Sequence, residues 1–225
     1  MNITALFIAL GGAIVLWFFL MRRLRTKPWI EKGLIDVPDG AVGIPAERIG
    51  LWIFLAVVTS FFSLLTIMYT ERSGSVDWRP LPDPQLLWIN TIFLLLGSVA
   101  IQRARSAANH DNLAGVKVNL TAGGVFTIVF VFGQLLAWDQ LTSSGYFLAT
   151  NPADTFFYLL TGLHGLHLFG GLWVWARTTN RVWRKLSFLN VTQIAEVRLS
   201  IQLCSVYWHF LLILWLMLFY LLSST

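Results

Sequence analysis

The sequence is poor in charge and in cysteine: 12% of its 225 residues are charged, and Cys204 is its one cysteine. Soluble domains contain about 25% charged residues, so this composition excludes a water-soluble enzyme and a disordered chain. A single cysteine excludes an internal disulfide and any metal cluster held by several thiolates. Apolar residues are abundant instead, at 56% of the chain, with 17 Phe and 11 Trp. The composition predicts an integral membrane protein.

Six long apolar runs come close to the roughly 20 residues that cross a bilayer as a helix. They cover residues 3–21, 49–70, 86–102, 120–141, 154–176 and 199–222. None alternates with the period of two that strands show. The third run is short, and we expect its helix to continue through residue 108. The sequence therefore predicts an all-α, polytopic membrane helix bundle with six transmembrane helices.

Lys and Arg are distributed unevenly between the two sides of this bundle. The segments after the first, third and fifth runs, at 22–48, 103–117 and 177–198, carry 14 of the 16. Because cytoplasmic loops are enriched in these residues, both termini are predicted on the outer side, which is the periplasm in a bacterium. The net charge of +5 therefore reflects topology, and no nucleic-acid partner is expected. The first run has no positive charge before it and is expected to remain as an uncleaved anchor.

The segment before the fifth run contains a helix-start signal. Residues 151–154 read NPAD, which offers an N-cap, a proline at the first helical position and an acid in the first turn. The sequence therefore predicts that the fifth transmembrane helix begins at about residue 152.

Three histidines lie inside the apolar runs. His164 and His167 are three residues apart and share a helix face, and His209 lies in the last run. Imidazole binds haem iron, zinc and copper, so a haem or metal site is one interpretation. The other is structural: hydrogen bonds across packed helices are worth around 1 kcal/mol in lipid, and Gly162 and Gly165 would admit a neighbouring helix. The residues favour the structural role, since a two-haem cytochrome b would need four mid-membrane histidines and the fourth histidine, His110, lies in a loop.

Two segments carry a resemblance to a known family. Residues 156–171 read FFYLLTGLHGLHLFGG, and residues 207–220 read YWHFLLILWLMLFY. They resemble subunit III of the haem–copper oxidases, the cytochrome c oxidase family, which has a glycine-flanked HGLH pair and a YWHF element in its last helix. Further matches follow in the family's order: GLWIFLA at 50–56, WINTIFLLLGS at 88–98, QLLAW at 134–138 and NPA at 151–153. The resemblance covers residues 50–222.

The resemblance also implies a division of the chain. The family has a five-helix bacterial core, and longer members add two helices in front of it. We accordingly expect a five-helix subunit III core at residues 48–225. Residues 1–47, outside the resemblance, would form an extra N-terminal transmembrane helix and a cytoplasmic loop.

The resemblance implies an accessory subunit of a haem–copper terminal oxidase in the bacterial inner membrane. Such a subunit has no catalytic residue, haem or metal of its own. It packs on subunit I, whose haems and copper reduce oxygen with electrons from cytochrome c in aerobic respiration, coupled to proton translocation. Subunit II is a second expected partner, and a small additional subunit or a respiratory supercomplex is a further candidate.

The family's helices also form a cleft that holds structural phospholipids. The lipid contacts implied here are Trp52, Thr59, Ser63, Arg184, Tyr207, Trp208 and His209. The helix-packing residues implied are His164, His167 and His209 with Gly162 and Gly165.

Three departures from the family pattern leave alternatives open. Many relatives have carboxylates where this chain has Val58, Gln202 and Leu212. One alternative is the same fold serving a quinol oxidase or a nitric oxide reductase, because nothing in the chain identifies the electron donor. The other is a free-standing haem-binding membrane cytochrome, which a Soret band from the isolated chain would indicate.

Overall fold

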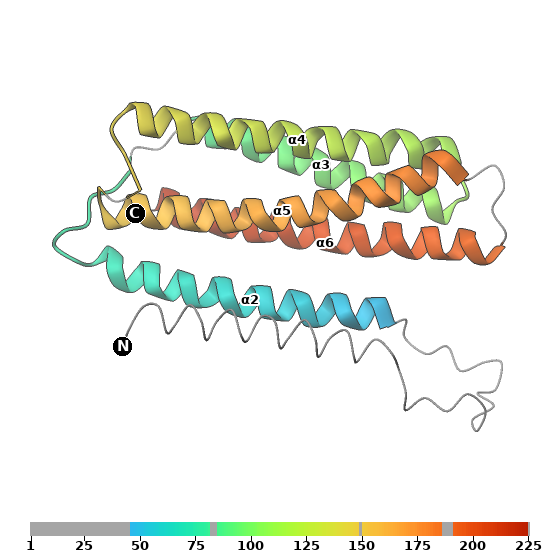
Figure 1. Cartoon of the computed structure of the whole chain (residues 1–225), viewed down its shortest axis with the longest axis horizontal. Helices are drawn as coiled ribbons and strands as arrows, with labels where there is room; N and C mark the ends of the chain where they lie inside the picture. The colour runs from blue at the N-terminus through green and yellow to red at the C-terminus, as the bar shows by residue number, and fades with distance from the viewer. Residues whose placement is uncertain (1–45, 82–84, 149, 186–190, 225) are drawn as a thin grey trace, which may run out of the picture. The chain divides into compact units, whose positions relative to one another are not determined.

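The computed structural model describes residues 46–81, 85–148, 150–185 and 191–224, which form five consecutive α-helices (Figure 1). They are α2 (Ala46–Ser73), α3 (Leu86–Asn109), α4 (Leu113–Ser143), α5 (Pro152–Lys185) and α6 (Val191–Ser223). All five are long and apolar enough to cross a membrane. The predicted all-helical membrane architecture is thus confirmed for these residues. The sixth predicted helix, at 3–21, lies outside them.

Four of the helices form a closed bundle, and the fifth packs on its side. α3 and α5 each lie against both α4 and α6, and α2 lies against α5 and α6 (Figure 1). The buried centre of the bundle is aromatic, with Phe130, Trp208 and Trp215 at 1% exposure or less. α2 contributes Phe62, which is fully buried against α5 and α6.

Indole N–H groups connect the helices across the bundle. They must find partners, because the bilayer core supplies no water to satisfy a polar group. Four indole nitrogens donate to neighbouring helices at 2.8–3.1 Å: Trp138 to Thr161 Oγ1, Trp175 to the Leu120 carbonyl, Trp208 to Thr127 Oγ1 and Trp215 to Thr91 Oγ1. Each bond joins two helices, so together they fix the mutual register of α3, α4, α5 and α6.

The helices extend further than the apolar runs at the end where α3 and α5 finish and α4 and α6 begin. α3 continues to Asn109, as predicted, but α4 already begins at Leu113. Within the predicted connecting segment 103–117, the helical continuation through residue 108 is confirmed, whereas residues 113–117, which were not expected to be helical, belong to α4. Asp111 makes the turn with a φ of 54°, and Asn112 caps α4 by accepting from the Gly115 N–H at 2.9 Å.

The same correction applies to the predicted connecting segment 177–198. α5 continues to Lys185, and α6 begins at Val191. Lys and Arg are good helix formers and reach the headgroup layer from a helix end by snorkelling. Charge therefore marks where a helix leaves the hydrocarbon, rather than where it stops.

The start of α5 confirms the predicted helix signal. α5 begins at Pro152, and Asn151 Oδ1 accepts from the Ala153 N–H at 3.3 Å. Asp154, in the first turn, is 1% exposed, and neither of its carboxylate oxygens has a hydrogen-bond partner among the described residues.

An ion pair connects the end of α2 to the segment that follows it. Arg72 Nη2 lies 2.6 Å from Asp77 Oδ2. A hydrogen bond from the Ser75 side chain, a backbone hydrogen bond and the Arg72 guanidinium hold the pKa of Asp77 below its ordinary value of 3.8. Because the pKa is lowered on folding, the stabilisation is present at neutral pH and is lost as pH falls through that lowered pKa.

Candidate functional site

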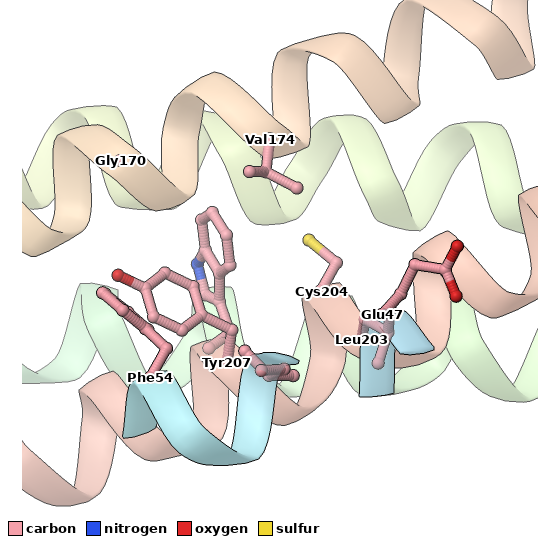
Figure 2. A pocket seen from close by; sticks show the side chains of 9 residues that line it. Glu47, Phe54, Gly170, Val174, Leu203, Cys204 and Tyr207 are labelled. Atoms are coloured by element: carbon pink, nitrogen blue, oxygen red, sulfur yellow. The ribbon is translucent and has the colours of Figure 1, made fainter. Parts of the chain in front are cut away.

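A cavity of about 340 Å³ lies between α2, α5 and α6 (Figure 2). Its walls are mostly apolar and come from three helices: Leu51 and Phe54 of α2, Gly170 and Val174 of α5, and Leu203, Cys204, Tyr207 and Trp208 of α6. Glu47, the remaining lining residue, lies at the opposite end from Phe54 and Tyr207 (Figure 2). The cavity therefore combines an apolar interior with one carboxylate at one end.

The way in which α2 packs on the bundle explains why this cavity exists. Val58, Phe62 and Tyr69 pack α2 against α5 and α6 from the middle of α2 to its C-terminal part. Between Ala46 and Val57, the only buried apolar side chain of α2 is Leu55. On α5, Gly170 has no side chain, and a Cβ there would meet no atom within 4 Å. The three helices are thus closely packed around Phe62 and Tyr69 and leave room beside the N-terminal part of α2.

Aromatic side chains hold one wall of the cavity in place. The Tyr207 hydroxyl donates to the His167 carbonyl at 2.9 Å, which ties α6 to α5. The Phe54 ring of α2 lies 6.0 Å from the Tyr207 ring and 6.1 Å from the His167 ring, measured between centroids. Offset or tilted aromatic contacts of this kind stabilise a packed arrangement. The wall is therefore preformed.

The volume is at the lower end of the range for small-molecule pockets. Apolar walls suit an acyl chain, since they place no unsatisfied polar group against it.

The structure places two of the predicted lipid contacts in this cavity, Tyr207 and Trp208. Trp208 is almost completely buried, with 1% of its surface exposed. Trp52, Thr59, Ser63 and His209 are not among the lining residues. Trp52 is 60% exposed on the surface of α2, and the side chain of Arg184 lies outside the described part of the chain.

Sequence reasoning missed most of the α2 and α5 walls, including Phe54, Gly170 and Val174. A signal was present for α2: Glu47, Leu51 and Phe54 are spaced by four and three residues, and so share one helix face. No signal in the sequence shows that Gly170 faces this space.

The two histidines of α5 face different neighbours. His164 is 1% exposed; its Nε2 lies 3.2 Å from the Leu211 carbonyl of α6, and its ring packs against Phe130 and Trp215. His167 Nδ1 lies 2.7 Å from the Leu163 carbonyl of its own helix, and its ring contacts Phe54 and Phe62 of α2.

His209 makes its hydrogen bond within α6, with Nδ1 2.6 Å from the Ser205 carbonyl. The structure thus gives each of the three imidazoles a backbone carbonyl as partner. Within the ranges described, no group of three His, Cys, Asp or Glu side chains is placed to hold a metal ion.

The glycines of α4 and α5 differ in what they face. The Trp138 ring of α4 lies against Gly162, at 3.5 Å from the position of a Cβ, whereas a Cβ at Gly165 would meet nothing within 4 Å. The tightest positions are glycines that sequence reasoning did not select: a Cβ at Gly124 would overlap the Trp175 ring, and one at Gly133 would overlap Asn90.

Replacing His164 by Leu tests whether the histidines are structural. We expect the haem content of the purified complex to be unchanged and its stability to fall by about 1 kcal/mol, because one hydrogen bond between helices is lost. The measurement is a pyridine haemochrome spectrum together with thermal inactivation in detergent. His110→Leu, in the turn between α3 and α4, is the matched control. A lower haem content for the His164 variant alone would contradict the structural role.

Comparison with known proteins identifies the architecture. The sequence pattern of the family described as cytochrome c oxidase subunit III matches residues 49–223. The chain belongs to the cytochrome c oxidase subunit III family. It is accordingly an accessory membrane subunit of a haem–copper oxidase, which is an oxidoreductase complex.

Individual relatives agree with this family. The chain is 30% identical to cytochrome c oxidase subunit 3 of Thermostichus vulcanus over 85% of this chain and 94% of that one. It is 28% identical to the subunit of the same name from Synechocystis sp., over 80% and 76%. It is also 25% identical to cytochrome bo(3) ubiquinol oxidase subunit 3 of Buchnera aphidicola, over 76% and 82%.

The three positions that depart from the subunit III pattern occupy different surroundings. Val58 is 4% exposed in the apolar contact of α2 with α5 and α6. Leu212 is partly buried against the core of the bundle. Gln202 accepts a long hydrogen bond of 3.5 Å from Arg48 Nη2, which links α6 to the start of α2. Two of the substituted positions are thus packed as apolar side chains, and the third pairs with a cation.

Proposed function

We propose that this subunit III packs on oxidase subunit I and holds a phospholipid in the cavity between α2, α5 and α6. The observation that carries the proposal is the cavity itself, whose walls are apolar except at Glu47. The chain is proposed to supply no redox centre and no catalytic residue, so that oxygen reduction takes place at the haems and copper of subunit I. Its proposed contribution is to stabilise subunit I and to hold the lipid in its own cavity.

The proposed location is the bacterial inner membrane, with the C-terminus on the periplasmic side. The distribution of charge over the bundle supports this orientation. At the end where α2, α4 and α6 begin and α3 and α5 finish, the cations whose side chains are described are Arg48, Arg103, Arg105, Lys117, Arg177, Arg181 and Arg198. At the other end the cations in the described ranges are Arg72 and Arg79. Positive residues favour the cytoplasmic side.

Purification of the complex in a mild detergent tests the proposed function. We expect this chain to co-elute with a haem-containing subunit I and with subunit II, together with tightly bound phospholipid measured by phosphorus content and lipid mass spectrometry. Recovery of the chain alone with a Soret band would contradict the accessory role. Recovery of the complex without retained phospholipid would contradict the lipid role only.

A second candidate function is the corresponding subunit of a quinol oxidase. The similarity to the ubiquinol oxidase subunit of Buchnera aphidicola favours it, whereas the two cyanobacterial relatives are named as cytochrome c oxidase subunits. The electron donor is decided in subunit II, where only the cytochrome c type needs a dinuclear copper centre. Copper content of the purified complex therefore distinguishes the two.

A further inference from the structure

The outward face of α6 carries a polar side chain among exposed apolar ones. Ile213 and Tyr220 are 67% and 74% exposed, and His209 lies on the same face, because residues four and eleven apart on a helix point in nearly the same direction. Exposed apolar residues need no partner in a bilayer. An imidazole does, and His209 is only half-buried.

The hydrogen bond that His209 makes determines what its other nitrogen offers. Its Nδ1 lies 2.6 Å from the Ser205 carbonyl oxygen. A carbonyl oxygen only accepts, so Nδ1 carries the proton, and in the neutral ring Nε2 is an acceptor. No described residue lies within hydrogen-bond distance of Nε2.

A second polar group lies beside it on α3. Gln102 is exposed, and its Oε1 accepts from the Ser205 hydroxyl at 3.0 Å. Its amide nitrogen keeps two N–H donors for which the described residues supply no partner. Ser205 thus joins Gln102 and His209, and together they present an acceptor and donors on one surface. We call these three residues the α3–α6 polar patch.

The patch lies deep in the hydrocarbon. Arg198 and Asp111 form an ion pair of 2.6 Å at the inner end of α6, which marks the level of the membrane boundary. His209 is eleven residues beyond Arg198, about 16 Å along the helix, and Gln102 is nine residues from Asp111, about 13 Å. The core is about 30 Å thick, so both side chains are near its middle. Water does not satisfy polar groups at that depth.

We infer that the α3–α6 polar patch docks a transmembrane helix of another polypeptide of the oxidase, one that carries a hydroxyl or amide side chain at mid-membrane. Such a group donates to His209 Nε2 and accepts from the Gln102 amide. The inference rests on the proposed function, since it assumes assembly in an oxidase.

Other occupants fit the chemistry less well. Acyl chains have no hydrogen-bonding group. The apolar run at residues 3–21 has no hydroxyl, amide or imidazole side chain between Thr4 and Trp17, which leaves its middle without a partner for the patch.

Photo-crosslinking in the intact complex tests the inference. A benzophenone amino acid at Ile213, which is exposed beside the patch, is expected to form an adduct with another oxidase chain. The same probe at Phe169, exposed on α5 at 58%, is the control for a surface without such polar groups. An adduct at Ile213 with lipid alone or with a second copy of this chain would overturn the inference. Failure of the chain to co-purify with any haem-containing subunit would instead overturn the proposed function.

Substitution of the patch gives an independent measurement. In the complex, His209→Leu is expected to lower the ratio of bound to free subunit about threefold, and the double variant with Gln102→Leu about tenfold, as expected for lost hydrogen bonds in a membrane. Leu216→Ala, on the same helix, is the control for a purely apolar contact. Thermal stability of the subunit that remains bound shows whether the variant still folds. Retention equal to the unsubstituted complex would overturn the inference.

Discussion

Replacing Gly124 by Ala is expected to lower the stability of the subunit by about 2–3 kcal/mol, the range for overpacking a close contact. A Cβ at this position of α4 would overlap the six-membered ring of Trp175. The indole cannot move aside freely, because its Nε1 donates to the Leu120 carbonyl at 2.8 Å. Either α4 and α5 separate or this hydrogen bond is lost.

Gly165→Ala is the matched control, because a Cβ there would meet nothing within 4 Å. We expect its stability to be unchanged or higher by up to about 1 kcal/mol, since Ala is the better helix former. Cys204 provides the assay: it is the only cysteine of the chain and is 2% exposed. Its rate of thiol labelling during heating of the complex, read from its own peptide by mass spectrometry, reports unfolding of this subunit. Equal labelling of both variants would show that the α4–α5 contact tolerates a methyl group.

This pair of glycines also shows the limit of prediction from the sequence. Both lie in apolar runs, and the residues near them are similar in composition. What distinguishes them is the facing side chain, and Trp175 is 51 residues away from Gly124. Long-range pairing of this kind is determined by packing of the whole bundle, and it leaves no local pattern.

The helices themselves were predictable, because the bilayer imposes a length and an apolar composition on every segment that crosses it. Asn151 and Pro152 correctly predicted the start of α5 for a local reason, the capping of free N–H groups. The predictions were wrong for the starts of α4 and α6 and the end of α5, where the helices continue beyond the apolar runs.

The direction in which each polar side chain faces was not predictable for α6. This helix is apolar on all sides, so hydrophobic periodicity does not distinguish its core face from its outer face. From the sequence, His164 of α5 and His209 of α6 could not be distinguished, because each simply lies within an apolar run. In the structure His164 is buried at the contact with α6, whereas His209 lies on the outward face.

Filling the cavity between α2, α5 and α6 is expected to prevent binding of the proposed phospholipid without disturbing the bundle. Gly170 lines the cavity, and a Cβ there would meet no atom within 4 Å, so Gly170→Phe directs a ring into space that an acyl chain would otherwise fill. We expect retention of phospholipid through detergent washing to fall at least about tenfold, equivalent to about 1.4 kcal/mol. The initial rate of oxygen reduction should be unchanged, because this chain is proposed to hold no redox centre, while activity should decay faster during sustained turnover.

Gly165→Phe is the control on the same helix. Its Cβ position is equally open, but Gly165 is not among the cavity-lining residues. Lipid mass spectrometry of the two washed complexes, with oxygen consumption followed over many turnovers, separates the effects. Loss of lipid in both variants would point to general loosening of α5, and full retention in the Gly170 variant would show that the phospholipid binds elsewhere. Loss of lipid from the Gly170 variant alone, together with faster loss of activity, would link sustained activity of the oxidase to an acyl chain held by Phe54, Tyr207 and Trp208.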